Sequence, residues 1–134
     1  MATKLNPYLT FGGNARAALE FYQSVFGGDL TAQTFKEAGV PQAPEREDQL
    51  MHGQLITTNG MTLMASDDPE GHDAQSASIA VSGEDKAELS KYWDALTQGA
   101  AIEAPFETAP WGDTFGMLTD AYGIRWMINV VTAQ

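Results

Sequence analysis

The chain has 134 residues, of which 43% are hydrophobic, and its formal net charge at pH 7 is −11. This length predicts a single domain, 1–134, with one modest core. The acidic balance disfavours nucleic acid and anionic membrane surfaces as partners. Cysteine is absent, which excludes disulfides and thiolate chemistry, and no apolar stretch approaches the roughly 20 residues of a membrane span. We therefore expect a cytoplasmic protein.

An internal repeat organises the chain. A shift of 71 positions aligns the paired aromatics and the flanking glycines of the two halves: Phe21-Tyr22 on Tyr92-Trp93, Gly12 on Gly83 and Gly28 on Gly99. A repeat of this size indicates two copies of one supersecondary module. We expect the copies to span residues 1–67 and 74–134 and to enclose a cleft.

The first module begins with a predicted strand over 6–11. A helix follows, with Asn14 as its predicted N-cap and glycines at 27 and 28 as its end, because apolar residues recur at helical spacing between them. Looser alternation predicts a second strand over 29–37. The proline-containing, charged stretch 38–49 is predicted to be a loop.

Two further strands, 50–58 and 61–67, flank Asn59-Gly60. Asn-Gly between alternating runs is typical of a two-residue type I′ hairpin. That turn pairs residues whose numbers have a constant sum, and cross-strand partners share one face of a sheet. The predicted pairs are Ile56 with Leu63, Gln54 with Ala65 and His52 with Asp67.

The second module repeats the order. A strand over 76–82 precedes a helix that ends at Gly99, and three strands follow over 101–106, 114–119 and 124–130. The order βαβββ occurs twice. It predicts an α+β chain whose helices cover one face of a curved, mostly antiparallel sheet.

Several motifs carry a family resemblance. They are Asn6-Pro7-Tyr8-Leu9-Thr10-Phe11, Phe26-Gly27-Gly28, Met51-His52-Gly53, Met64-Ala65-Ser66-Asp67 and Trp111-Gly112-Asp113 with Asp120-Ala121-Tyr122-Gly123. In these motifs the chain resembles the glyoxalase/bleomycin-resistance/dioxygenase superfamily, also called vicinal oxygen chelate, and in particular its PhnB-like branch. The resemblance implies a glyoxalase-like fold of two βαβββ modules. It does not imply one reaction, since a fold can carry many functions.

The resemblance also implies where a metal would be held. In metal-using members one ligand comes from the first and one from the last strand of each module, and these places fall here on Pro7, Leu63, Ser78 and Met127. Proline and leucine offer no donor, methionine sulfur is a poor ligand for hard or borderline ions, and one serine cannot hold a metal alone. We therefore expect neither a metal nor another cofactor.

Counted from these implied positions, alternation along the strands predicts which side chains face the cleft. They form an apolar cavity with a few polar groups, which is the usual composition of a small-molecule site. The predicted ligand-binding residues are Leu9, His52, Gln54, Leu63, Ser78, Trp111, Arg125, Met127 and Asn129. Trp111 is a candidate for ligand stacking or for ordinary packing, and Arg125 for an anion anchor or a surface salt bridge.

His52 opposite Asp67 is the sharpest candidate for catalysis. A carboxylate partner would fix the imidazole tautomer and keep its basicity near neutrality, as proton transfer requires. The alternative interpretation is that the pair only satisfies two polar groups at the margin of the sheet.

Three functions follow from these observations. The favoured one is a metal-independent protein that binds or sequesters a small molecule as a homodimer. The second is an isomerase- or lyase-type enzyme that uses His52 and Asp67 for proton transfer. The third is a metal enzyme with displaced ligands drawn from His52, Asp67 and Asp113.

Overall fold

The computed structural model describes residues 5–68 and 78–131. By the density of its internal contacts the chain divides into two compact units, Met1–Gln75 and Ser76–Gln134. Over these described residues each unit contains one helix and one four-stranded sheet. The predicted α+β architecture of two βαβββ modules is thereby confirmed. Neither helix of the described residues has the length and apolar character needed to cross a membrane.

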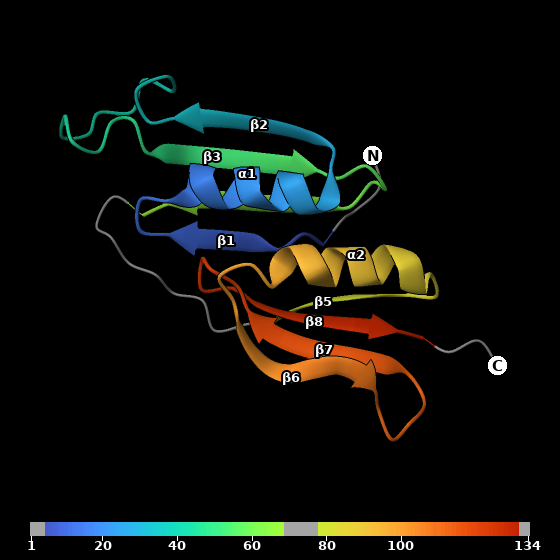
Figure 1. The fold of residues 1–134 in the computed structure, drawn as a ribbon. Coiled ribbons are helices and arrows are strands. Elements are labelled where there is room, and N and C mark those ends of the chain that lie inside the picture. Colours follow the sequence, from blue (N-terminus) through green and yellow to red (C-terminus); the bar gives the residue numbers. More distant parts are fainter. Residues whose placement is uncertain (1–4, 69–77, 132–134) are drawn as a thin grey trace. The chain divides into compact units, whose positions relative to one another are not determined.

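The first unit follows the predicted order (Figure 1). Its elements are β1 (Tyr8–Phe11), α1 (Ala15–Phe26), β2 (Asp29–Thr34), β3 (Leu50–Ile56) and β4 (Thr62–Asp67). The strands lie in the order β1-β4-β3-β2. β1 pairs with β4 in parallel, and the other two pairings are antiparallel.

The second unit has the same topology. Its elements are β5 (Ser78–Gly83), α2 (Lys86–Leu96), β6 (Ala101–Thr108), β7 (Thr114–Thr119) and β8 (Arg125–Val130). The strands lie in the order β5-β8-β7-β6, with β5 and β8 parallel. The internal repeat therefore extends from the sequence to the strand connections of both units.

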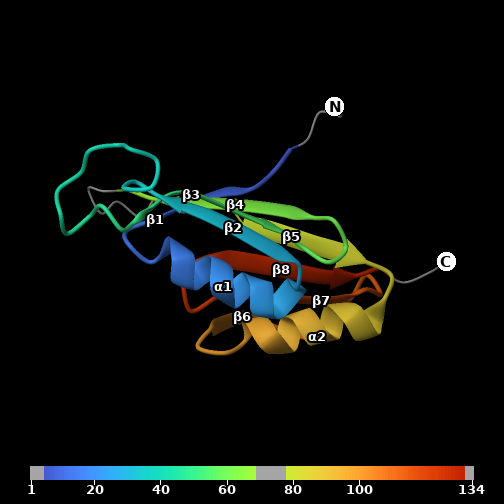
Figure 2. The ribbon, with the colours of Figure 1, turned by 90° about the horizontal axis from the view of Figure 1, so that it is seen from above.

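Each helix covers one face of its own sheet (Figure 2), and a glycine in the sheet lets it approach. Gly53 on β3 lies under Leu19, whose Cδ1 atom an added Cβ would overlap. Gly116 on β7 lies under the Trp93 ring, and a Cβ there would come within 2.7 Å of a ring carbon. Leu19 and Trp93 are both buried. We call the opposite side of each sheet, turned away from the unit's own helix, its distal face.

The hairpin between β3 and β4 differs from the predicted type I′ turn. Thr57 N–H donates to the Met61 carbonyl, and Gly60 N–H donates to the Thr57 carbonyl. Gly60 has φ +87°, whereas no described residue other than glycine has a positive φ. A type I′ turn requires positive φ at both central positions, so the observed turn is the three-residue loop with a left-handed glycine.

This loop moves the register by one residue. Leu55 lies opposite Leu63, Gly53 opposite Ala65 and Gln54 opposite Met64. The predicted pairs of Ile56 with Leu63, Gln54 with Ala65 and His52 with Asp67 are therefore wrong. Side chains alternate between the two faces along a strand. A slip of one residue therefore puts side chains of β3 and β4 that were predicted to share a face on opposite faces.

Candidate functional site

The distal face of the first sheet carries a tyrosine–histidine pair. The Tyr8 hydroxyl lies 3.4 Å from Nδ1 of His52, and the two ring centroids are 5.9 Å apart. Tyr8 pairs with Met64 across β1 and β4, and Met64 pairs with Gln54 across β4 and β3. This face thus combines the imidazole of His52, the phenol of Tyr8, the amide of Gln54 and the thioether of Met64. Tyr8 is half exposed.

Asp67 lies on the opposite side of that sheet, against α1. Its Oδ1 accepts the backbone N–H groups of Gly13 and Ala15, and its Oδ2 accepts that of Leu50, each at 2.9 Å. The side chain is buried, with 4% exposed. It takes the capping role that the sequence assigned to Asn14, whose side chain makes no cap bond. Asp67 is thus a structural carboxylate, and the predicted His52–Asp67 pairing on one face is wrong.

Two predicted ligand-binding residues also face the helix. Leu9 pairs with Ala65 in the parallel ladder and shares its face, and Leu63 pairs with Leu55. All four are buried in the core. The predicted cleft-facing orientation of Leu9 and Leu63 is therefore wrong. In their place the same alternation brings Tyr8 and Met64 to the distal face.

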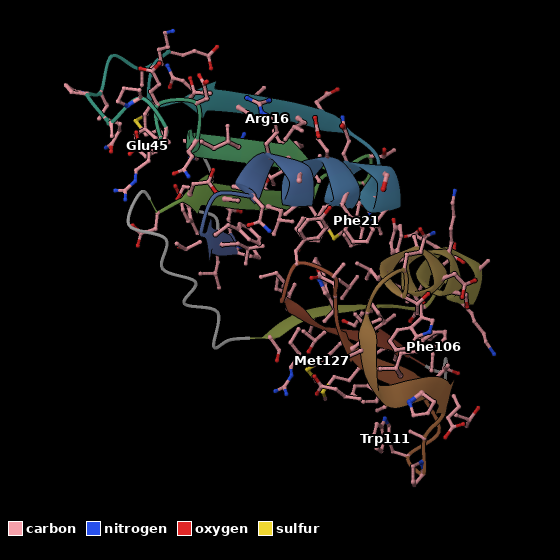
Figure 3. The ribbon with its side chains drawn as sticks, turned by 60° about the vertical axis from the view of Figure 1, so that its left-hand side comes forward. Arg16, Phe21, Glu45, Phe106, Trp111 and Met127 are labelled. Atoms are coloured by element: carbon pink, nitrogen blue, oxygen red, sulfur yellow. The ribbon has the colours of Figure 1, made fainter. Side chains whose placement is uncertain are left out.

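The distal face of the second sheet is rich in soft, apolar groups. Met127 pairs with Met117 and with Ala80, and Asn129 pairs with Phe115 and Ser82. Asn129 Nδ2 donates to Asp113 Oδ2 at 3.1 Å, which orients the amide. Ser78 and Arg125 are paired on the same face. The predicted common face of Ser78, Arg125, Met127 and Asn129 is confirmed (Figure 3 labels Met127).

Arg125 is engaged in an ion pair at the margin of this face. Its guanidinium Nη2 lies 3.0 Å from Glu103 Oε2, and its Nε donates to Glu103 Oε1 at 3.2 Å. The Thr119 hydroxyl donates to the same carboxylate at 2.6 Å. This hydrogen bond, together with Arg125, lowers the pKa of Glu103 below the usual glutamate value. Of the two roles considered for Arg125, the structure shows the salt bridge.

Trp111 lies in the connection between β6 and β7 (Figure 3). It is 64% exposed, and its ring meets that of Phe115 edge-on, with centroids 5.7 Å apart. Phe115 is on the distal face, next to Asn129. An exposed indole held by one aromatic neighbour presents a flat apolar surface for stacking.

The residues at the implied metal positions do not fit a metal. Ser78 and Met127 lie on a distal face, but Leu63 points into the core, and Pro7 has no side-chain donor. The alternative ligands were His52, Asp67 and Asp113. Asp67 is not available to a metal, because its carboxylate accepts hydrogen bonds from three backbone N–H groups. In the part of the chain that the structure describes, no three His, Asp or Glu side chains are grouped as metal ligands would be.

Known proteins match the chain over most of its length. A family model described as the Glyoxalase/Bleomycin resistance protein/Dioxygenase superfamily matches residues 4–128. Protein YjdN of Escherichia coli K12 is 32% identical, and the alignment covers 97% of each chain. The crystal structure of protein PA1353 from Pseudomonas aeruginosa has a TM-score of 0.84 at 32% identity, covering 98% of this chain and 100% of that one. A Bacillus cereus structure described as a putative 3-demethylubiquinone-9 3-methyltransferase, PhnB protein, has a TM-score of 0.78 at 27% identity, covering 96% and 100%.

Proposed function

We propose that this chain, which belongs to the glyoxalase/bleomycin-resistance/dioxygenase superfamily, is a metal-independent protein that binds a small molecule on a distal face of its sheets. The observation that carries the proposal is the composition of those faces. Methionine and aromatic side chains are interspersed with a few hydrogen-bonding groups, Gln54, His52 and Asn129 among them. Apolar surface supplies affinity, and a small number of placed polar groups supplies orientation.

The methionines favour a ligand with an apolar, polarisable body. Met64, Met117 and Met127 all lie on distal faces and are partly buried. Thioethers are flexible and make favourable contacts with aromatic rings. Trp111 and Phe115 add a stacking surface at one end of the second sheet. A ligand with a planar apolar ring and one or two hydrogen-bonding groups matches these side chains.

A proton-transfer enzyme of the isomerase or lyase type is the second candidate, and the Tyr8–His52 pair is the observation that favours it. His52 would act with Tyr8, because Asp67 is committed to backbone N–H groups. Turnover that is lost in His52→Ala and reduced in Tyr8→Phe would identify this function. Turnover that survives both substitutions would exclude it.

The binding function is tested by a thermal-shift screen against metabolite and antibiotic libraries, on protein stripped of metals and kept in chelator. A hit is then titrated by calorimetry into the wild type, Gln54→Leu and the matched surface variant Gln98→Leu. We expect Gln54→Leu to weaken binding by about 10-fold, which is the loss of one good hydrogen bond. Gln98, exposed after α2, should tolerate the change. Equal affinity in all three proteins would contradict the placement of the site, and hits that need a divalent ion would contradict metal independence.

A further inference from the structure

Side chains on the distal face of the second sheet form three rows across β7 and β8. The rows are the ladder partners Arg125 with Thr119, Met127 with Met117 and Asn129 with Phe115. Successive rows are two residues apart along each strand, which is about 7 Å. Along β8 the face therefore changes from a cationic row to an apolar row and then to a row with an amide and an aromatic ring, over about 13 Å.

The middle row is an apolar strip. Met117 and Met127 are partly buried, and the residues paired with them on the neighbouring strands are alanines, Ala80 on β5 and Ala104 on β6. Thioether side chains are flexible and adapt to apolar groups of different shapes. This row offers apolar contact to the body of a ligand, and the direction of the ligand must come from the two outer rows.

The guanidinium of Arg125 has a fixed orientation and unused donors. Its Nε donates to Glu103 Oε1 at 3.2 Å, and its Nη2 lies 3.0 Å from Glu103 Oε2. The Thr119 hydroxyl donates to the same carboxylate at 2.6 Å and so fixes Glu103 in turn. An arginine side chain has five N–H donors in one plane, and the three that do not face Glu103 have no acceptor among the described residues. Half of the side chain is exposed, so an acceptor on a ligand can reach them.

Glu103 also determines which acceptor fits best. Its carboxylate balances the charge of Arg125, and the whole chain carries a formal charge of −11. A carboxylate ligand on Arg125 would lie near the Glu103 carboxylate, and two like charges at short range repel. An uncharged carbonyl oxygen accepts the same N–H groups without that repulsion. The ion pair therefore favours a neutral acceptor over an anion.

The opposite end of the face is aromatic. Phe115 is the ladder partner of Asn129, and the exposed ring of Trp111 meets it edge-on (Figure 3 labels Trp111 and Met127). The amide of Asn129 is held by Asp113 at 3.1 Å. Exposed aromatic rings stack with planar rings. The two outer rows thus recognise different chemical groups.

We propose that Arg125 sets the direction of the ligand, which is an elongated, uncharged molecule lying along β8. A carbonyl oxygen of the ligand accepts the free N–H groups of Arg125, its apolar body lies on Met117 and Met127, and its planar ring lies at Phe115. This inference rests on the proposed function and adds the charge and the direction of the ligand. Arg125 is a specificity-determining residue through the ion pair that holds it.

The probe is 6-phenylhexan-2-one, in which four methylene groups join a phenyl ring to a methyl ketone. 5-Phenylpentanoate has the same shape with a charged oxygen in place of the terminal methyl, and 5-phenylpentan-1-amine replaces the acceptor by a cationic donor. Each is titrated at 0.15 M salt, where surface charges are largely screened, into full-length protein labelled with methyl-¹³C-methionine. We expect saturable shifts of Met117 and Met127 with the ketone, and at least 5-fold weaker binding of both charged compounds. No saturable shift of either methionine with the ketone, or equal or tighter binding of a charged compound, would overturn the proposal.

Nuclear Overhauser contacts between the ketone and the protein give its direction. We expect the acetyl methyl protons to contact the Arg125 side chain and the phenyl protons to contact Phe115. The reverse pattern, or contacts of both ends with both residues, would overturn the proposal. The proposed function would still stand in that case if a library ligand moved the distal methionines. It would fail only if no ligand moved them.

Two substitutions separate the donors of Arg125 from its charge. Arg125→Met keeps an unbranched side chain without N–H groups and should weaken ketone binding about 10-fold, which is the loss of one good hydrogen bond. Arg16→Met, at an exposed position of the first unit, is the matched control and should leave the affinity unchanged. Circular dichroism checks that both variants are folded. Wild-type affinity for the ketone in Arg125→Met would overturn the proposal.

Glu103→Gln removes the balancing charge and leaves Arg125 in place. This variant should reverse the preference, so that 5-phenylpentanoate binds more tightly than the ketone. Glu84→Gln makes the same change of net charge at an exposed position of the same unit and should keep the preference for the ketone. An unchanged preference in Glu103→Gln, or an equal reversal in Glu84→Gln, would show that the Glu103–Arg125 pair does not select the ligand, and the proposal would be wrong.

Discussion

Asp67 joins the start of α1 to the start of β3 through three backbone N–H groups. Hydrogen bonds to a buried carboxylate contribute about 1.5–3 kcal/mol each. We predict that Asp67→Asn, which replaces one acceptor oxygen by an N–H₂ group, lowers the free energy of unfolding by about 2–4 kcal/mol. Urea unfolding measures this loss. Circular dichroism is the signal to follow, because all three tryptophans belong to the second half of the chain and their fluorescence reports on that half.

Asp29→Asn is the matched control for that substitution. Asp29 is exposed at the start of β2, so the same change of charge and shape should cost less than about 0.5 kcal/mol. Hydrogen exchange of the α1 amides should accelerate in Asp67→Asn alone. An Asp67→Asn protein as stable as Asp29→Asn would mean that the carboxylate does not hold these elements together.

Glu103 gives a residue-scale prediction for pH. The Thr119 hydroxyl, and then Arg125, stabilise its carboxylate and lower its pKa below the usual 4.5. Since the folded pKa is the lower one, its stabilising contribution is full above the usual glutamate pKa and is lost as the pH falls through the folded value. Thr119→Val should raise the pKa of Glu103 in a ¹³C-carboxyl titration. Glu37 is the control, because its pKa is lowered mainly by hydrogen bonds with Thr34 and should stay unchanged in Thr119→Val. Equal shifts of the Glu103 and Glu37 pKa values would contradict a local effect of the Thr119 hydroxyl.

At the scale of elements, the β3–β4 turn decides which side chains share a face. Asn59 has a negative φ, and its Oδ1 accepts the Thr57 hydroxyl at 2.7 Å. We predict that Asn59→Gly lowers the free energy of unfolding by about 1 kcal/mol, through lost backbone restriction and the lost hydrogen bond. Gly60→Ala should cost about 1–2 kcal/mol, because Gly60 is left-handed. In a type I′ turn Asn59 would have positive φ, which asparagine and glycine both tolerate, and Asn59→Gly would cost little. An unchanged free energy in urea unfolding would contradict the observed register.

The order of helices and strands was predictable, because helical and alternating periodicities are strong in both halves. The hairpin register was not. Asn59-Gly60 suits a two-residue turn and equally a three-residue loop with glycine last, and the two differ by one residue. That single residue separates His52, on the distal face, from Asp67 and Leu63 on the helix side. In the second sheet the alternation of Arg125, Met127 and Asn129 assigned the face correctly.

Two other features depended on contacts between elements distant in sequence. The capping of α1 by Asp67 joins residues more than 50 positions apart, and local pattern pointed to Asn14. A groove lined by Arg16, Glu45 and Gln49 depends on how the loop before β3 packs against α1. Neither leaves a periodic signal. The Tyr8–His52 pair could have been found, because the alternation of β1 from buried Phe11 places Tyr8 on the other side.

For the whole molecule, we predict a homodimer. Among the described residues each sheet ends in strands that have a ladder partner on one side only, β1 and β2 in the first and β5 and β6 in the second. Such edges are usually covered or paired in native proteins. Sedimentation velocity at micromolar concentration should show a dimer. A single monomeric species across that range would contradict the prediction.

The central claim is that the distal faces bind a small molecule without a metal. Methyl-¹³C-methionine labelling tests it most directly, because Met64, Met117 and Met127 lie on those faces and Met61 lies beside the hairpin turn. A library hit is titrated into labelled protein in chelator, and mass spectrometry follows the ligand. The account predicts saturable shifts of the methyl resonances of Met64, of Met117 and Met127, or of all three. The Met61 resonance should not move, and the ligand should stay chemically unchanged. Shifts that appear only after a stoichiometric divalent ion is added, or conversion of the ligand to a product, would contradict it.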